Sequence, residues 1–318
     1  MKGTVVIVMY NAIKFVGECL NSLKTDAMDG WINVVAVDNV STDGTAEYVA
    51  EQYPWVTLVR SPDNGGFGAG NNIGLSQMDS DDSGQSDWCF ILNPDTVVSA
   101  GCLRKLSDFL DEHQDVGCVG PGVTDESGEQ IVSYQPFMNL WTSFWVAVGL
   151  QRILPLNRTD EQWELRRHPP SKIVQVDRLL GAAMMIRRLA LDQIGGFDER
   201  YFLYSEEEDL CIRLQNTGWK IAYNPSGTIT HSGAKSTGAD NPLAIAATDW
   251  SRYLFMAKHY SKGTAEISRW IWIVMITLRY LLSFLKGGAR KEGYRLSLKS
   301  LINIGYFDRE LRPKRADH

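Results

Sequence analysis

The sequence contains few of the residues that form disulfide frameworks or zinc sites. Its 318 residues include five cysteines and five histidines. The cysteines are an odd number, with no Cys-x-x-Cys pair and no His/Cys metal spacing, which is typical of a protein kept in a reducing compartment. No secretory leader is visible, because an apolar, β-branched run begins at Thr4. We therefore expect a cytoplasmic protein.

Two common nucleotide-binding loops are also missing. No Gly-Lys-Ser/Thr follows a glycine-rich loop, which excludes a P-loop, and no Gly-x-Gly-x-x-Gly follows the first expected strand, which argues against a dinucleotide-dependent dehydrogenase. Residues 79–87 are acidic but lack the ligand spacing of a calcium loop. The composition itself, 44% hydrophobic and 22% charged residues, is that of a globular α/β protein.

Acidic residues outnumber basic ones overall, but the C-terminal segment is basic. The net charge is −6, whereas residues 251–318 contain 14 Lys and Arg against 5 Asp and Glu. These basic residues are interleaved with apolar ones, a pattern that favours an anionic membrane surface over nucleic acid. We expect no nucleic-acid partner.

The apolar run at 270–286 is nearly long enough to span a bilayer. Arg279 stands near its centre and would be costly there, so an amphipathic helix lying in the membrane interface fits better. We expect peripheral membrane contact through residues 269–291, on the inner face of the plasma membrane. The alternative is a helix packed in the protein core. The aromatic-rich residues 136–156 are expected to form a helix that packs on the sheet or lines an acceptor cleft.

Polar residues follow three of the four expected strands. Apolar runs at 4–9, 34–37 and 88–92 end in Tyr10-Asn11, in Asp38-Asn39 and in Asn93-Pro94-Asp95, and 56–59 is a further strand. With the intervening helical pattern they form βαβ units of a parallel sheet. Ligands of such sheets bind at the carboxyl ends of the strands, so we expect one shared crevice. The simpler interpretation is that Asn and Asp only terminate strands.

Four features could carry chemistry. Asn93 and Asp95 offer the oxygen ligands that Mg²⁺ or Mn²⁺ prefers, although an Asn-Pro-Asp turn can equally cap a helix. The carboxylates at 206–209 open a helix, either because acids suit its dipole or because their crowding tunes a general base. The glycine-rich residues 64–74 offer backbone N–H groups to an anion. His231 is expected in a turn after a strand at 220–223.

The ordered motifs resemble the family 2 inverting glycosyltransferases with a GT-A fold, and among them the rhamnosyltransferase-like branch. The resemblance covers about residues 4–237. It rests on the strand ends above and on Ser41-Thr42-Asp43-Gly44-Thr45, Asn64 to Gly74, Gly181-Ala182, Gly195-Gly196-Phe197-Asp198-Glu199, Phe202-Leu203-Tyr204 and Asp209-Leu210 with Arg213.

The resemblance implies a Rossmann-like, mostly parallel central sheet flanked by helices, and a nucleotide-sugar donor site. Its binding residues would be Tyr10, Asn11 and Asp38 for the base and ribose, Asn64 and Asn71 for the pocket wall, and Asn93 and Asp95 in place of the usual Asp-x-Asp. Asp95 and His231 would hold Mg²⁺ or Mn²⁺.

The resemblance also implies a catalytic base in the acidic segment. The family usually reads Glu-Asp-x-Asp-Leu where this chain has Glu206-Glu207-Glu208-Asp209-Leu210, so Glu207 would be the base, with Glu206 as the alternative. The reaction would invert the anomeric carbon while transferring a sugar to a glycan or lipid-linked acceptor in cell-surface polysaccharide synthesis. The favoured donor is dTDP-L-rhamnose. A UDP-hexose or galactofuranose donor, or a non-catalytic nucleotide-sugar-binding protein, remains the alternative.

We expect two units in the chain. Residues 1–237 would form the glycosyltransferase domain, with a nucleotide-binding half at 1–98 and an acceptor and catalytic half at 99–237. Residues 238–318 would form a basic, amphipathic helical extension.

Overall fold

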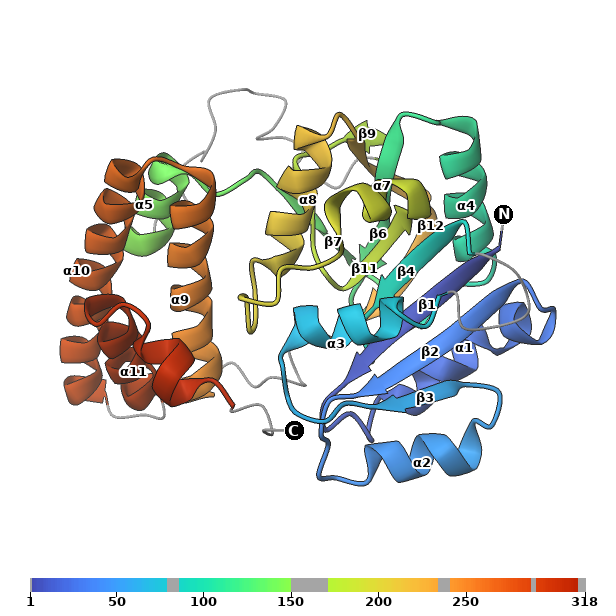
Figure 1. The fold of residues 1–318 in the computed structure, drawn as a ribbon, viewed down its shortest axis with the longest axis horizontal. Helices are drawn as coiled ribbons and strands as arrows, with labels where there is room; N and C mark the ends of the chain where they lie inside the picture. The colour runs from blue at the N-terminus through green and yellow to red at the C-terminus, as the bar shows by residue number, and fades with distance from the viewer. Residues whose placement is uncertain (1, 79–85, 150–170, 234–240, 287–289, 314–318) are drawn as a thin grey trace.

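The computed structural model describes residues 2–78, 86–149, 171–233, 241–286 and 290–313. The acidic loop at 79–85 therefore lies outside the described residues. A ten-stranded sheet forms the centre (Figure 1), with the order β3-β2-β1-β4-β11-β6-β12-β5 and with β7 on β6 and β9 on β12. The strands are β1 (Gly3–Met9), β2 (Ile32–Asp38), β3 (Thr57–Arg60), β4 (Trp88–Leu92), β5 (Thr96–Val98), β6 (Val116–Thr124), β7 (Gln130–Ile131), β9 (Val174–Gln175), β11 (Ala183–Arg187) and β12 (Lys220–His231).

The expected mostly parallel sheet is confirmed. β1 pairs in parallel with β2 and β4, β2 with β3, and β6 with β12, while β11 runs antiparallel between β4 and β6. A separate two-stranded ladder joins β8 (Tyr134–Gln135) to β10 (Arg178–Leu179). β1, β2 and β4 are buried runs because helices cover both faces of a parallel sheet.

Helices cover both faces of the sheet, and alternate residues of β1 show why. Val5, Ile7 and Met9 enter one core with α1 (Val16–Met28), α2 (Thr45–Gln52) and α4 (Cys102–Glu112). Val6 enters the opposite core with α7 (Arg188–Ile194) and α8 (Glu206–Asn216). All five cysteines are free and buried, consistent with the absence of a disulfide framework.

The glycine-rich segment serves packing. α3 (Phe67–Leu75) lies against β1, and a Cβ added at Gly70 or Gly74 would come within 2.7 Å of Val8 or 2.3 Å of Val6. The N–H of Phe67 donates to the carbonyl of Phe202. These residues therefore fix α3 on the sheet, and the N–H group of Phe67 is already satisfied within the protein.

A bundle of helices stands beside the sheet (Figure 1). It contains α5 (Leu140–Val148), α9 (Pro242–His259), α10 (Lys262–Lys286), α11 (Arg290–Ile302) and the short π-helix η2 (Phe307–Leu311). α5 packs on α10 through Ala147, which shares a core with Trp272 and Ile276. The aromatic segment is thus helical as expected over 140–148, but it packs on the bundle instead of the sheet.

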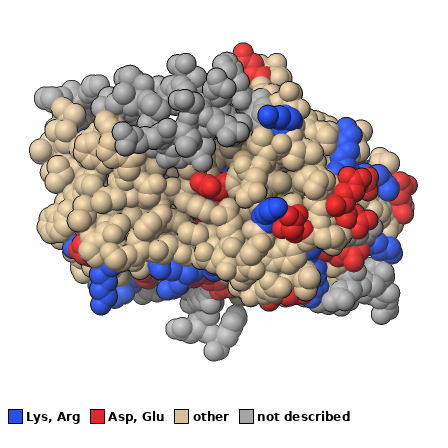
Figure 2. Space-filling model, turned by 90° about the horizontal axis from the view of Figure 1, so that it is seen from above, with Lys and Arg blue, Asp and Glu red and all other residues tan. Residues whose placement is uncertain are grey.

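α10 has one packed face and one exposed apolar face. Trp272 and Ile276 are buried against neighbouring helices, whereas Trp270, Val274 and Leu281 are exposed. Arg279 points inward and donates to the carbonyl of Ala147 on α5. Figure 2 shows few charged side chains over the bundle and basic ones along one edge. By length and composition the segment at 262–284 could cross a membrane.

Candidate active site

The strand ends meet at one edge of the sheet, as the sequence predicts. Met9 pairs with Asp38 and Ile7 with Leu92, so the residues that follow β1, β2 and β4 are neighbours. Tyr10 is half exposed there, and Asp38 is buried. One carboxylate oxygen of Asp38, Oδ1, has no hydrogen-bond partner in the described parts of the chain. A buried acceptor left open at a strand end is available for a ligand donor.

Asn11 connects the end of β1 to a neighbouring loop. Its φ of 51° is left-handed, and its Oδ1 accepts a hydrogen bond from the N–H of Thr42 at 2.8 Å. Its own N–H donates to Ser41 Oγ at 3.0 Å. Asn11 therefore couples the end of β1 to the loop before α2.

Asn64 and Asn71 lie within the glycine-rich segment. Asn64 Oδ1 accepts from Asn39 Nδ2 at 2.9 Å and from the N–H of Gly66. Asn71 is fully buried in α3, where its Nδ2 donates to the carbonyl of Phe67. The side-chain oxygens of both Asn71 and Asn39 have no partner among the described residues. Asn39 was not among the residues expected to bind the donor, although it follows Asp38 directly in the sequence.

Asp95 and His231 are adjacent although 136 positions separate them in the sequence. β5 runs antiparallel to β12 and pairs Thr96 with His231, which puts His231 Nε2 3.2 Å from Asp95 Oδ1. His231 is the last residue of β12, so the expected turn is wrong. Asp95 leads directly into β5, so it does not cap a helix.

The donor set of this pair fits a divalent cation. Asp95 Oδ1 is buried and receives no hydrogen bond from a described residue. No group of three or more His, Cys, Asp or Glu side chains suited to a metal occurs in the described ranges. A site with one carboxylate and one imidazole leaves the remaining positions to water and substrate phosphates, as Mg²⁺ sites often do. Asn93 is held by its backbone, which donates to Ala182 and accepts from Thr96.

The acidic segment begins α8, and all four of its carboxylates are buried. Tyr204 and Ser205 before it have φ values of 66° and 67°, a conformation that non-glycine residues rarely adopt and that turns the chain sharply into the helix. Burial, followed by the charge of Glu207, raises the pKa of Glu206 well above its ordinary value. Glu206 Oε2 has no partner among the described residues.

Glu207 faces a cavity and is paired with an arginine. Arg178 of β10 donates to Glu207 Oε1 at 3.1 Å and lies 3.6 Å from Glu208. Glu208 also accepts from the N–H of Met138. Burial raises the pKa of Glu208, and the charge of Arg178 partly opposes that effect. Arg178 belongs to no recognisable motif, so sequence reasoning could not find it.

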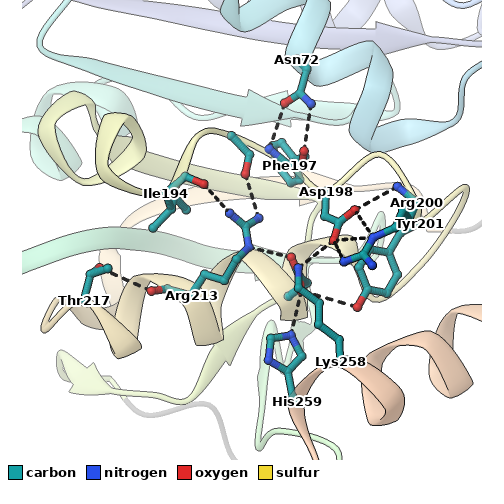
Figure 3. A network of polar contacts seen from close by, with 12 residues as sticks. Asn72, Ile194, Phe197, Asp198, Arg200, Tyr201, Arg213, Thr217, Lys258 and His259 are labelled. Carbon is teal, nitrogen blue, oxygen red and sulfur yellow. Dashed lines mark hydrogen bonds and ion pairs between the residues drawn. The ribbon is translucent and has the colours of Figure 1, made fainter.

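Asp209 ties α8 to α9. Its carboxylate accepts from Arg213 of its own helix and from Lys258 and His259 of α9, at 2.6 to 2.7 Å (Figure 3). Burial favours protonation, but the contacts from His259, Arg213 and Lys258 outweigh it and lower the pKa of Asp209. Arg213 thus forms the expected helix salt bridge and also donates to the carbonyls of Ile194 and Gly196.

A cavity of about 610 Å³ separates the acidic end of α8 from the bundle. Glu207 and Arg178 lie on its sheet side, and Arg252 and Trp272 lie on its bundle side. Gly181 lies beside Glu207, and the carbonyl of the next residue, Ala182, accepts from Asn93. The acidic segment and the Asp95 turn therefore border the same short stretch of chain.

Comparison with known proteins decides the family. The model of "Glycosyl transferase family 2" matches residues 4–166, half of the chain, and that of "Glycosyl transferase family group 2" matches 88–307. The chain belongs to glycosyltransferase family 2. It is 33% identical over 248 residues to the N-acetylglucosaminyl-diphospho-decaprenol L-rhamnosyltransferase of Mycobacterium tuberculosis, covering 75% of this chain and 79% of that protein.

More distant relatives agree. This family 2 glycosyltransferase is 22% identical over 235 residues to rhamnosyltransferase WbbL of Escherichia coli, covering 71% of this chain and 82% of that one. A Pyrobaculum calidifontis mannosyltransferase solved with GDP-Man and Mn²⁺ superposes with a TM-score of 0.57, at 15% identity over 97% of this chain and 88% of that chain. GalNAc-T7, solved with UDP, GalNAc and Mn²⁺, superposes with a TM-score of 0.59 at 13% identity. The match covers 98% of this chain and 58% of that chain. The expected GT-A fold is thereby confirmed.

Proposed function

We propose that this glycosyltransferase transfers L-rhamnose from dTDP-L-rhamnose to a lipid-linked glycan acceptor in cell-wall polysaccharide synthesis. The observation that carries the proposal is the convergence of the Asp95–His231 pair and the cavity-facing Glu207 on the stretch at 181–182. The similarity to two rhamnosyltransferases supports the choice of sugar and acceptor.

Glu207 is the base in this proposal. It lines the cavity, and its ion pair with Arg178 holds one of its oxygens in place. Glu206 is a poorer base because burial, followed by the charge of Glu207, raises its pKa and so favours the protonated form. Glu207 takes the proton of the acceptor hydroxyl. That oxygen then bonds to the anomeric carbon as the bond to the departing diphosphate oxygen breaks, which inverts the configuration.

Asp95 and His231 would hold Mg²⁺ or Mn²⁺. A divalent cation there supplies positive charge next to the departing nucleoside diphosphate. Tyr10, Asn11 and Asp38 would form the base and ribose side of the crevice, with Asn64 and Asn71 behind them. The open oxygen of Asp38 can accept a hydrogen bond from the imide N–H that thymine and uracil share.

A panel of nucleotide sugars tests the donor. Binding raises the midpoint of thermal unfolding by mass action, so dTDP-L-rhamnose with Mn²⁺ should give the largest rise, and UDP-glucose and UDP-galactofuranose smaller ones. The Asp95→Asn variant should lose the metal-dependent part of that rise. A larger response to a UDP-sugar that is also the better transfer substrate would overturn the choice of donor.

The exposed apolar face of α10 supports contact with the membrane that would contain a lipid-linked acceptor. A bilayer would cover Trp270, Val274 and Leu281, while Arg279 stays inside the bundle. We propose that the protein is cytoplasmic and peripheral on the inner face of the plasma membrane, with contact through 269–291. The division into a domain at 1–237 and an extension at 238–318 remains a prediction, with α5 of the first range packed on the second.

A further inference from the structure

We propose that the bundle side of the 610 Å³ cavity is an anion subsite, formed by Arg252, Ser143 and Trp272, which binds the diphosphate of the lipid-linked acceptor. This inference rests on the proposed function, because it assigns a place to one part of the proposed acceptor. It adds a second phosphate-binding site to the chain, separate from the one that Asp95 and His231 would supply for the donor.

Two buried donors on this wall have no partner. Ser143 of α5 is 1% exposed, and its Oγ makes no hydrogen bond to any described residue. Trp272 of α10 is 3% exposed, and its Nε1–H is likewise unpaired within the described ranges. An unpaired buried donor typically costs about 1–3 kcal/mol, so two of them on one cavity wall suit a ligand that accepts hydrogen bonds.

Arg252 supplies the positive charge. It projects from α9, where NH1 pairs with Asp249 at 2.9 Å and the guanidinium carbon lies 4.5 Å from the centre of the Trp272 ring. These contacts fix the plane of the guanidinium beside the indole. A guanidinium held in this way presents its remaining N–H groups in a fixed direction, which suits phosphate oxygens.

The subsite and the base share the cavity. Glu208 is within electrostatic reach of both Arg178 and Arg252, since each guanidinium lowers the pKa that burial raises. An acceptor with its sugar hydroxyl at Glu207 could thus place its diphosphate at Arg252. Its lipid would then leave past Val146 of α5, on the way to the apolar groove that Phe144 and Trp270 line on the outer face of the bundle.

Farnesyl diphosphate tests the subsite by binding alone, without any transfer reaction. Calorimetry is run in EDTA, which removes metal-dependent diphosphate binding at Asp95. We expect the wild-type protein to bind farnesyl diphosphate and not farnesol. Ser143→Ala, Trp272→Phe and Arg252→Gln should each weaken binding about tenfold, the loss typical of one hydrogen bond to a charged group.

Trp145→Phe is the matched control, because Trp145 also lies on α5 with an unpaired buried Nε1 but does not line the cavity. It should bind like the wild type. Ser143→Ala removes only an unpaired hydroxyl, so it should unfold at the wild-type temperature or above. No binding by the wild type, or equal binding by all variants, overturns the subsite.

Kinetics separate this inference from the proposed function. With a farnesyl-linked N-acetylglucosaminyl diphosphate as acceptor, the Ser143→Ala and Trp272→Phe variants should raise the acceptor KM about tenfold and leave the donor KM unchanged. With octyl N-acetylglucosaminide, which has no diphosphate, the variants should match the wild type. Equal kinetics with both acceptors contradicts the subsite alone, whereas no rhamnose transfer to either contradicts the proposed function.

Discussion

Glu206 and Glu207 are adjacent in the sequence but lie in opposite environments. Glu206 is buried with an unpaired oxygen and a raised pKa, whereas Glu207 lines the cavity and pairs with Arg178. Glu207 and Glu208 both line the cavity, whereas Glu206 is not among its lining residues. Sequence reasoning named both Glu206 and Glu207 and could not separate them, because the decision depends on Arg178, 29 positions before Glu207.

The raised pKa of Glu206 predicts a pH-dependent stability. Because its folded pKa is raised, the stabilisation it contributes is complete below the unfolded value of about 4.3 and is lost as the pH rises. Glu206→Gln should therefore be more stable than the wild type at pH 8, and the difference should narrow as the pH falls and be smallest once the pH is below about 4.3. Urea unfolding at pH 4, 6 and 8 measures this, with the exposed Glu51→Gln as control. A difference that does not vary with pH would contradict the raised pKa.

Asp95 and His231 are a second case in which sequence reasoning named the residues but not their arrangement. Asp95 and His231 were both named, but His231 was placed in a turn. β12 is interrupted at Pro225-Ser226-Gly227, where its register with β6 shifts, so the sequence pattern ends before the strand does. Only the pairing of β5 with β12 shows why the two residues meet.

At the scale of elements, Asp209 is the main polar link between α8 and the bundle. It joins the helix that carries Glu207 to Lys258 and His259 on α9 (Figure 3). The sequence predicted the bounds of β1, β2, β3 and β4 within one or two residues, because their apolar runs are uninterrupted. It could not predict this link, since α9 shows no motif that points to Asp209.

Removing this carboxylate should destabilise the protein. Asp209→Ala leaves Arg213, Lys258 and His259 without their shared partner, and we expect a loss of about 3 kcal/mol, as for other buried ion pairs. Asp192→Ala is the control, because it breaks an exposed i,i+4 pair with Arg188 and should cost below about 1 kcal/mol. Urea unfolding at pH 7 compares them. Equal losses would show that Asp209 does not connect the two helices.

The pH dependence of wild-type stability provides a second test of the stabilisation by Asp209. Its folded pKa is lowered, so its stabilisation is present above the unfolded value of about 3.9 and is lost as the pH falls through the folded pKa. The stability difference between the wild type and Asp209→Asn should therefore narrow below about pH 4.

At the scale of the whole molecule, the apolar face of the bundle and the active-site cavity lie on the two sides of α5. Phe144 and Val148 face the outer groove, and Ser143 and Val146 line the cavity. The sequence identified the apolar run at 270–286, but its angular pattern left two alternatives, interface or core. The structure shows α10 with one face packed and the other exposed, which neither alternative described fully.

Vesicle binding tests the exposed face. Trp270→Ser with Leu281→Ser should weaken sedimentation with anionic phospholipid vesicles at least tenfold, since each buried apolar side chain contributes about 1.5–3 kcal/mol. The control is Leu189→Ser on α7, which removes an equally exposed leucine far along the chain from the bundle. Wild-type protein that stays in the supernatant at physiological salt would contradict the membrane contact.

Rhamnose transfer by the Glu207→Gln and Glu206→Gln variants tests the assignment of Glu207 as the base most directly. With dTDP-L-rhamnose, Mn²⁺ and a short-chain N-acetylglucosaminyl diphospholipid, Glu207→Gln should lose about a thousandfold in kcat while keeping its unfolding temperature and donor affinity. Glu206→Gln should keep most of the wild-type rate. Near-normal turnover by Glu207→Gln, with loss of activity in Glu206→Gln, would contradict the assignment of the base.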